Sequence, residues 1–191
     1  MSYIPYNIAI SGKANSGKNT VAKILFDELE IDELGRVTAA FADPIKEGLL
    51  KLYPTASREC LWGSSALRAE IIPGTNVTYR QVLLDLGAQA RRYDEDHWVK
   101  ILLATRENAA ADAFIVSDLR FPNEFEALKD KFFTIRIRRP HELQLSDVSE
   151  TSQDKLPDSA FDFVIDNNST LDALRTQCKE AIKQLKEKSC L

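Results

Sequence analysis

The chain contains few residues with sulfur or imidazole side chains. Its 191 residues include three cysteines, two histidines and one methionine. The cysteines (Cys60, Cys178 and Cys190) are odd in number and lack a C-x-x-C spacing, so neither a disulfide framework nor a zinc site is indicated. The histidines, His97 and His141, belong to no metal-ligand pair and to no Ser/His/Asp arrangement. These absences favour a reducing, cytoplasmic setting.

Long apolar runs and an overall basic charge are also lacking. No stretch reaches the roughly 18 apolar residues that a membrane helix needs, and the N-terminal segment lacks the basic region and apolar core of a signal peptide. The net charge is −4, so no overall field attracts a nucleic acid polymer. With 44% hydrophobic and 28% charged residues, the composition is that of an ordinary globular protein. We therefore expect a cytoplasmic protein that binds neither membranes nor nucleic acid polymers.

A glycine-rich segment near the N-terminus is the most informative motif. Residues 12–20, GKANSGKNT, contain the pattern G-x-x-x-x-G-K between an apolar run and a helical pattern. In this strand–loop–helix arrangement, backbone N–H groups, a helix N-terminus and Lys18 surround a phosphate chain. Asn19 stands where Ser or Thr is usual, and the hydroxyl follows one place later at Thr20. The alternative is a Gly/Ser turn before an ordinary helix.

Short apolar runs alternate with helical patterns along the chain. This alternation predicts a parallel sheet with helices on both faces. Near the C-terminus, Ser169 and Asp172 resemble a capping box at the start of the last helix. The expected strands are Ile4–Ser11, Arg36–Phe41, Ala113–Ser117, Phe132–Ile137 and Phe161–Ile165.

Two segments between the expected strands are longer than simple connections. The first, between the second and third strands, contains helical patterns at Pro44–Tyr53 and from Thr78 to Arg92. Because it is too long for a plain crossover, we expect it to build a substrate site. The second, His141–Pro157, is polar and rich in serine and aspartate. It is interpreted either as a mobile lid or as a solvated loop.

Charged residues follow the expected strands at their carboxyl ends, where doubly wound sheets bind ligands. Asp118 ends the third strand like the acid that holds Mg²⁺ in P-loop proteins, and Asp43 follows the second strand. Arg136, Arg138 and Arg139 end the fourth strand, from which an arginine can reach a transferring phosphate. Helix caps or turns are the alternative for the acids, and a solvated strand edge for the arginines.

A pair of arginines in the first long segment forms a second candidate anion site. On a continuous helix Arg80, Leu84, Gly87 and Arg91 share one stripe. The glycine between two guanidinium groups would let an anion approach the backbone closely. Surface arginines that bind no ligand are the alternative.

Five stretches of the chain, taken together and in order, resemble the bacteriophage deoxynucleoside monophosphate kinases of the P-loop NMP-kinase superfamily. They are ISGKANSGKNTVA, AFADPIKEGL, YRQVLLDLGAQARRYDEDHWV, FIVSDLRFPNEFEAL and VIDNNSTLDAL, and they span most of the chain. The resemblance implies an α/β three-layer P-loop NTPase fold with a five-stranded parallel sheet of order 2-3-1-4-5. It implies a single domain with its core at 1–43, 110–140 and 158–191, a helical nucleotide-binding excursion at about 44–109 and a lid at about 138–157.

The same resemblance implies Mg²⁺-dependent transfer of a phosphoryl group from ATP to a (deoxy)nucleoside 5′-monophosphate. The implied catalytic residues are Lys18, Asp118 and Arg138, and the implied metal ligands are Asn19, Thr20 and Asp118. The implied ATP-binding residues are Gly12, Lys13, Asn15, Ser16, Gly17, Lys18, Asn19, Thr20, Arg138, Asn167 and Thr170. The implied acceptor-binding residues are Asp43, Lys46, Arg80, Gln89, Arg91, Trp98, Arg120 and Glu124.

The chain departs from the family pattern at two places. Asn19 offers a neutral oxygen where a carboxylate or hydroxyl is common, and the adenine-side turn reads N-N-S-T rather than N-D-G-T at residues 167–170. Two other functions stay open: a small-molecule phosphate kinase of the phosphomevalonate or dephospho-coenzyme A type, and a P-loop nucleotide-binding module without an acceptor. The sequence does not indicate which base or sugar the acceptor carries. It also leaves open whether the protein forms a homodimer. If the chain is phage-encoded, its cytoplasmic location is that of the host.

Overall fold

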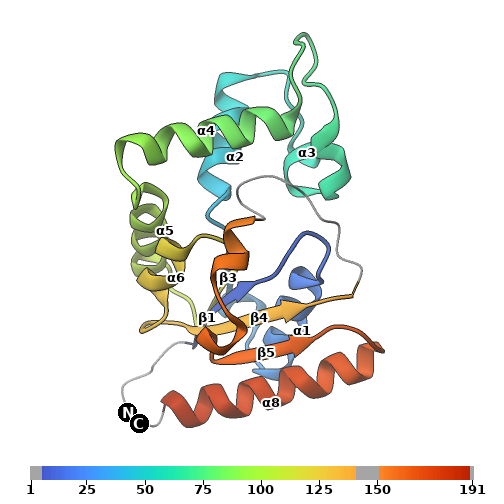
Figure 1. The fold of residues 1–191 in the computed structure, drawn as a ribbon, viewed down its shortest axis with the longest axis vertical. Coiled ribbons are helices and arrows are strands. Elements are labelled where there is room, and N and C mark those ends of the chain that lie inside the picture. The colour runs from blue at the N-terminus through green and yellow to red at the C-terminus, as the bar shows by residue number, and fades with distance from the viewer. Residues whose placement is uncertain (1–5, 141–150, 190–191) are drawn as a thin grey trace. The chain divides into compact units, whose positions relative to one another are not determined.

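The structure is a computed structural model that describes residues 6–140 and 151–189 (Figure 1). The chain divides into two compact units. The first unit comprises the residues up to Ala40 and those from Leu103 onward, and the second is Phe41–Leu102. Residues 141–150 of the expected lid lie outside the described residues, so the structure describes only the two ends of that segment.

The first unit is built on the parallel sheet that the sequence predicts. Five strands pair in the order β2-β3-β1-β4-β5, and each lies within two residues of an expected run where the chain is described. The predicted fold class, an α/β fold with a sheet of order 2-3-1-4-5, is therefore confirmed. The strands are β1 (Tyr6–Ser11), β2 (Arg36–Ala39), β3 (Ala113–Leu119), β4 (Phe133–Arg138) and β5 (Phe163–Asp166).

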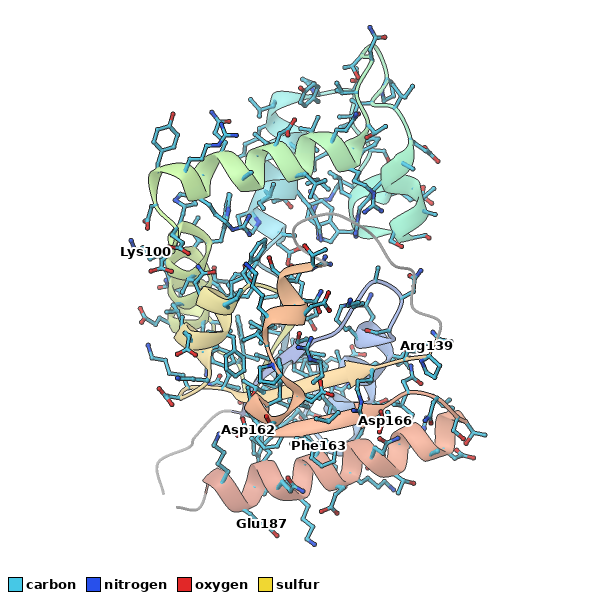
Figure 2. The ribbon with its side chains drawn as sticks, viewed as in Figure 1. Lys100, Arg139, Asp162, Phe163, Asp166 and Glu187 are labelled. Carbon is cyan, nitrogen blue, oxygen red and sulfur yellow. The ribbon has the colours of Figure 1, made fainter. Side chains whose placement is uncertain are left out.

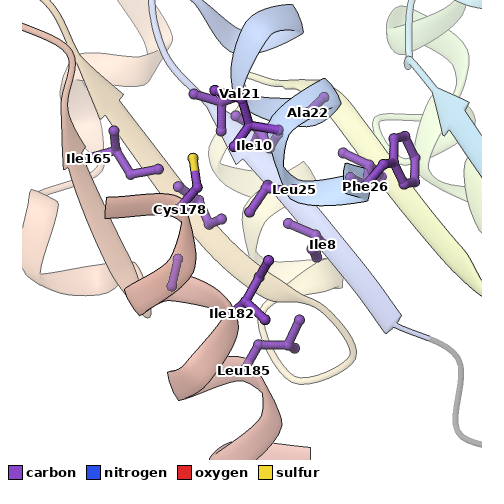
Figure 3. Close-up of a cluster of buried hydrophobic side chains, with 14 of the residues drawn as sticks. Ile8, Ile10, Val21, Ala22, Leu25, Phe26, Ile165, Cys178, Ile182 and Leu185 are labelled. Carbon is purple, nitrogen blue, oxygen red and sulfur yellow. The ribbon is translucent and has the colours of Figure 1, made fainter. Parts of the chain in front are cut away.

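Helices α1 (Lys18–Glu28) and α8 (Leu171–Ser189) pack on one face of this sheet. Side chains alternate along a strand, so Ile8 and Ile10 of β1 point to the same face. They meet Leu25 of α1 and Cys178 of α8 in a cluster whose members are almost wholly excluded from solvent (Figure 3). This core fixes the start of α1 relative to the end of β1.

Helices α5 (His97–Asn108) and α6 (Pro122–Leu128) pack on the other face of the sheet through contacts that involve aromatic rings. Helix α6 contributes Phe125, whose ring centroid lies 5.0 Å from that of Phe161. On the same side of the sheet, Arg106 of α5 places its guanidinium carbon 5.4 Å from the Phe114 ring centroid. The first unit therefore has three layers. Within the described residues, no helix has the length and apolar character needed to span a membrane.

The register of the strands brings three carboxyl ends together. Ser11, the last residue of β1, lies opposite Leu119 of β3 and opposite Arg136 of β4. The pairing of β1 with β3 shifts between Ala9 and Ser11. The segment that leaves β1 therefore starts between the end of β3, which carries Asp118, and the end of β4.

Short 3-10 helices and one cap complete the first unit. They are η1 (Glu33–Gly35), η3 (Ser152–Lys155) and η4 (Asp158–Ala160). At the start of α8 the Thr170 hydroxyl accepts a hydrogen bond from the Ala173 N–H at 3.2 Å. The N-terminal hydroxyl contact is thus made one residue later than the Ser169–Asp172 pattern predicts.

The second unit is helical and has its own small core. Its elements are α2 (Asp43–Leu52), α3 (Arg58–Trp62), η2 (Ser65–Ala69), α4 (Tyr79–Tyr93) and the beginning of α5. The ring of Tyr79 is buried in this core, and its hydroxyl accepts the Ser57 N–H at 2.7 Å. Thr78 and Gln81 form a capping box at the start of α4. Both helical patterns predicted in this segment are confirmed, with their ends displaced by one residue.

Candidate phosphate-binding site

The loop between β1 and α1 has a backbone shape that favours glycine. Gly17 has a φ of 100° and Asn15 a φ of 61°, both in the left-handed region. A Cβ on Gly17 would lie 2.5 Å from Asn167 Nδ2, and a Cβ on Gly12 would lie 2.9 Å from the Ile137 carbonyl oxygen. The two glycines of the sequence motif therefore stand where the loop passes closest to its neighbours.

The positive end of α1 opens into this loop. Its N-cap residue, Gly17, has no side-chain capping bond, and the first turn carries no acidic residue. The first N–H groups of a helix have no partner inside the helix and give this end a partial positive charge. The Lys18 ammonium donates to the carbonyls of Gly12 at 2.5 Å and Lys13 at 2.7 Å, so a full charge lies over the loop.

The Ser16 hydroxyl is a buried polar group inside the loop. Ser16 is fully excluded from solvent, and its Oγ has no hydrogen-bond partner among the residues that the structure describes. Buried hydroxyls are normally satisfied, so one that is not indicates a site for an acceptor. Together with Lys18 and the start of α1, it gives the loop the character of an anion site.

Two side chains from neighbouring strand ends hold the loop. Asn167, which follows β5, donates its side-chain amide to the Ser16 carbonyl at 2.8 Å and its backbone N–H to the Arg138 carbonyl at 2.8 Å. Arg139, which follows β4, donates to the Asn15 carbonyl at 3.0 Å. The side-chain amide of Asn167 thus supports the phosphate loop, and the place beside the adenine that the resemblance implies for this turn stays a prediction. The resemblance does not single out Arg139, although the position of this arginine directly after β4 was enough to suggest a contact with the loop.

Arg138 is engaged by carboxylates at the same end of the sheet. Its Nε and Nη2 donate to the two oxygens of Asp166, each at 2.7 Å, and Nη1 donates to Asp158 at 2.9 Å. Arg139 and Asp166 are visible at this end of the strands in Figure 2. The hydrogen bonds that Arg138 donates to Asp166 lower the pKa of the carboxyl and raise the pKa of the guanidinium. The arginine predicted to reach the phosphate is therefore held here by two acids.

Arg136 joins the loop to the C-terminal part of the expected lid. It is 7% exposed, and its Nη1 donates to the Ser11 hydroxyl at 3.2 Å. Its Nη2 donates to the carbonyls of Gln153 at 2.9 Å and Leu156 at 2.7 Å. The sequence groups Arg136 with two exposed arginines, whereas the structure makes it an internal link.

The same segment also forms an ion pair with the loop. Lys13 Nζ lies 2.7 Å from an oxygen of Asp154 in η3. The Ser11 hydroxyl donates to the Gln153 side-chain oxygen at 3.4 Å, and Gln153 is fully buried. Asp154, in the C-terminal part of the expected lid, is thus the ion-pair partner of a lysine that is predicted to bind ATP.

The acidic residues of the site come from β3 and α6. Asp118 lies next to Leu119, the partner of Ser11, so the sheet places it beside the start of the loop. Glu124 is 2% exposed and accepts the N–H groups of Arg120 at 2.9 Å and Phe121 at 3.0 Å. Glu124 therefore holds the turn after Asp118, a positioning role.

The first turn of α1 supplies the other predicted metal ligands. Asn19 and Thr20 are both exposed there. Among the described residues, no group of three or more His, Cys, Asp and Glu side chains could hold a metal ion.

Most of the residues predicted to bind the acceptor lie in the second unit, whereas Arg120 and Glu124 lie in the first. Asp43 accepts hydrogen bonds from Lys46 Nζ at 3.0 Å and Trp62 Nε1 at 3.1 Å. Arg80 donates to the Ser65 carbonyl at 3.3 Å. Gln89 is exposed, and at 100° per residue it faces the opposite side of α4 from the arginine stripe.

The expected anion bay at Gly87 is filled by protein. A Cβ there would lie 3.3 Å from Ile45 Cδ1 and 3.4 Å from Arg91 Nη1. The Gly87 carbonyl accepts the indole N–H of Trp98 at 3.1 Å, and Trp98 is 8% exposed. Gly87 therefore lets α2 pack closely on α4 and is not open to an anion, while anion binding by Arg80 and Arg91 stays a prediction. Trp98 belongs to that packing.

No family model and no curated protein matches the chain. Among solved structures, it is similar to an unliganded sugar kinase from Janibacter sp. HTCC2649, at 16% sequence identity and a TM-score of 0.40. The match covers 96% of this chain and 95% of that chain. At this TM-score the likeness adds nothing about fold or activity.

Proposed function

We propose that this protein transfers the γ-phosphoryl group of ATP to a (deoxy)nucleoside 5′-monophosphate. The observation that carries the proposal is the position of the Lys18 ammonium over the carbonyls of Gly12 and Lys13, at a start of α1 without a side-chain cap. A P-loop lysine at a helix N-terminus binds the phosphates of a nucleotide. The resemblance to the phage kinases supports the choice of acceptor.

The loop residues fit a triphosphate chain. Its acceptor oxygens would take hydrogen bonds from the backbone N–H groups of residues 12–20, from the Lys18 ammonium and from the buried Ser16 hydroxyl. Glycine at 12 and 17 leaves the backbone accessible where a side chain would collide. Lys18 then neutralises charge that moves onto the bridging oxygen during transfer.

The donor set also fits a nucleotide-bound Mg²⁺. This ion keeps several waters and takes one or two carboxylates together with phosphate oxygens. Asp118 supplies one carboxylate beside the loop, and Asn19 and Thr20 offer neutral oxygens on the first turn of α1. When bound, the ion would withdraw negative charge from the phosphate chain.

The reaction needs positioning and charge more than proton transfer. A phosphate monoester has its second pKa near 6, so its attacking oxygen is already ionised at neutral pH. Of the arginines that end β4, Arg139 donates to the loop itself, whereas Arg138 would first have to leave Asp166 and Asp158. Arg139 is therefore better placed than Arg138 to contact a phosphate on the loop.

The second unit provides the cationic groups proposed for the acceptor. Arg80 and Arg91 lie on one stripe of α4, and Lys46 lies on the neighbouring α2. Guanidinium groups bind phosphate oxygens in a forked geometry that matches a 5′-monophosphate. A nucleotide-binding module without an acceptor would not require this second group of cations.

A coupled ADP-release assay tests the proposal. The purified chain is given ATP and Mg²⁺ with each common ribo- and deoxyribonucleoside monophosphate, and with phosphomevalonate and dephospho-coenzyme A as alternative acceptors. We expect ADP release that depends on a nucleoside monophosphate, and a raised acceptor KM in Arg80→Ala with little change in the KM for ATP. ATP binding without transfer to any monophosphate would contradict the proposal.

A further inference from the structure

The indole of Trp62 is an exposed aromatic ring held beside cations on the second unit. Trp62 ends α3 and is 38% exposed. The guanidinium carbon of Arg58 lies 4.4 Å from its ring centroid, and Lys46 Nζ lies 5.0 Å from it. Cations prefer the electron-rich face of an indole. One flat group, the Arg58 guanidinium, therefore already lies over the ring.

Hydrogen bonds fix the orientation of this ring. Its Nε1 donates to Asp43 at 3.1 Å, and the same Asp43 oxygen accepts Lys46 Nζ at 3.0 Å. Lys46 is 7% exposed and the Asp43 side chain is 35% exposed, so the lysine of this pair is buried while the carboxylate is partly exposed. A half-exposed tryptophan that is oriented in advance loses little further side-chain freedom when a ligand stacks on it.

The Arg58 guanidinium is held more loosely than the indole. Its side chain is 64% exposed, and its two bonds, at 2.8 Å and 3.2 Å, go to Glu47, whose side chain is 47% exposed. Ion pairs between exposed side chains contribute little in water. A flat heterocycle could take the position of the guanidinium while Arg58 stayed paired with Glu47 or moved into solvent.

We propose that Trp62 is the stacking surface for the nucleobase of the acceptor, with Asp43 and Lys46 as the residues that position its indole. The inference rests on the proposed function, because it gives the acceptor's base a place on the second unit. Asp43 and Lys46, which are predicted to lie on the acceptor side, then act there by holding the indole. Stacking tolerates every base but favours larger ones, so purine monophosphates bind more tightly than pyrimidine monophosphates.

Fluorescence of the single-tryptophan variant tests binding without turnover. The chain has two tryptophans, so Trp98→Phe leaves Trp62 as the only one. We expect dGMP, dAMP and dTMP to quench its emission, and deoxyribose 5-phosphate and inorganic phosphate to leave it unchanged. Equal quenching by the base-free phosphates, or none by any nucleotide, would overturn the inference.

If Trp98→Phe does not fold, a comparison of the wild type with the Trp62→Phe variant answers the same question. Here the emission change that nucleotides cause in the wild type should disappear when Trp62 is replaced, while the contribution of Trp98 remains. A nucleotide-dependent change that survives this replacement would assign the signal to Trp98 and overturn the inference.

Steady-state kinetics separate stacking from a structural role. Trp62→Ala should raise the acceptor KM on the order of tenfold, as expected for one lost base stack, with the KM for ATP and the melting temperature nearly unchanged. Trp62→Phe should recover most of the loss. Asp43→Ala should raise the same KM, and Asp43→Asn should restore it, because an amide oxygen still accepts the indole N–H.

The kinetic outcomes also distinguish this inference from the proposed function. An unchanged acceptor KM in Trp62→Ala, in a chain that phosphorylates a monophosphate, overturns only the stacking surface. Absence of turnover with every monophosphate contradicts the proposed function, and the fluorescence comparison then decides whether Trp62 binds a base at all.

Discussion

Arg138 and Asp166 form a two-pronged ion pair between the last residues of β4 and β5. The two residues are partners in the sheet register, and each arginine nitrogen lies 2.7 Å from its own carboxylate oxygen. Asn167, the next residue, donates to the Arg138 carbonyl and to the Ser16 carbonyl of the phosphate loop. The ion pair thus lies beside one of the supports of the loop.

Removing the carboxylate should destabilise the protein in a pH-dependent way. Hydrogen bonding to Arg138 lowers the folded-state pKa of Asp166. The stabilisation is therefore fully present above the unfolded pKa of about 3.9 and is lost as the pH falls through the folded value. We expect the difference in melting temperature between wild type and Asp166→Asn to be constant from pH 6 to 8 and to shrink below about pH 4. A difference that grows on acidification would contradict the assignment.

Arg136 and Arg138 offer a matched comparison two residues apart on one strand. Arg136→Ala removes buried bonds to the carbonyls of Gln153 and Leu156 and should lower the free energy of unfolding by about 3 kcal/mol. Arg138→Ala removes a half-exposed pair and should cost about 1 kcal/mol or less. Urea denaturation of both variants measures the difference, and equal losses would show that Arg136 is not an internal link.

Lys18 should be needed for turnover and not for folding. Lys18 is not among the buried core residues, and its ammonium donates to main-chain carbonyls of the loop, so Lys18→Ala should leave the circular dichroism spectrum and melting temperature close to wild type. The loss of transition-state charge stabilisation should reduce kcat by roughly 10²-fold or more. Lys23→Ala, an exposed site on the same helix, is the control. Unchanged turnover in Lys18→Ala would remove the basis of the proposed function.

The sequence predicts the parts of the molecule that depend on neighbouring residues. The loop from Gly12 to Lys18 and the position of Asp118 follow from short-range patterns, since a strand, a glycine turn and a helix are adjacent in the chain. The parallel sheet follows from the alternation of apolar runs with helices, and the resemblance supplied the strand order that the structure confirms.

Long-range packing decides the features that the sequence does not predict. Gly87 lies between two arginines in sequence, yet its role depends on Ile45 and Trp98 from other helices. Arg136 and Arg138 have the same residue type and share a face, and only the return of residues 151–158 buries one of them. The segment between α2 and α4 shows no clear period, and its buried residues Leu61 and Ile72 belong to a cluster that also includes Tyr79 of α4.

The loop glycine and a helix glycine should respond oppositely to alanine. Gly17→Ala places a side chain on a left-handed residue against Asn167 and should destabilise the protein by about 1–3 kcal/mol, with weaker ATP binding. Gly48→Ala in α2 meets no atom within 4 Å and should stabilise it by about 0.5–1 kcal/mol. Thermal unfolding of both variants provides the measurement. A neutral Gly17→Ala would indicate that the loop adopts another conformation in solution.

Cys178 should be chemically inert while the protein is folded. It is fully buried on α8, and desolvation, with a smaller contribution from Glu28, raises the pKa of its thiol to about 12. At pH 8 the thiolate fraction is then about 10⁻⁴, and the thiolate is the reactive form. Iodoacetamide labelling followed by peptide mass spectrometry should find Cys178 unmodified in the native chain and fully modified in urea. Labelling of Cys178 at the native-state rate of an exposed cysteine would show that α8 does not stay packed against β1 and α1.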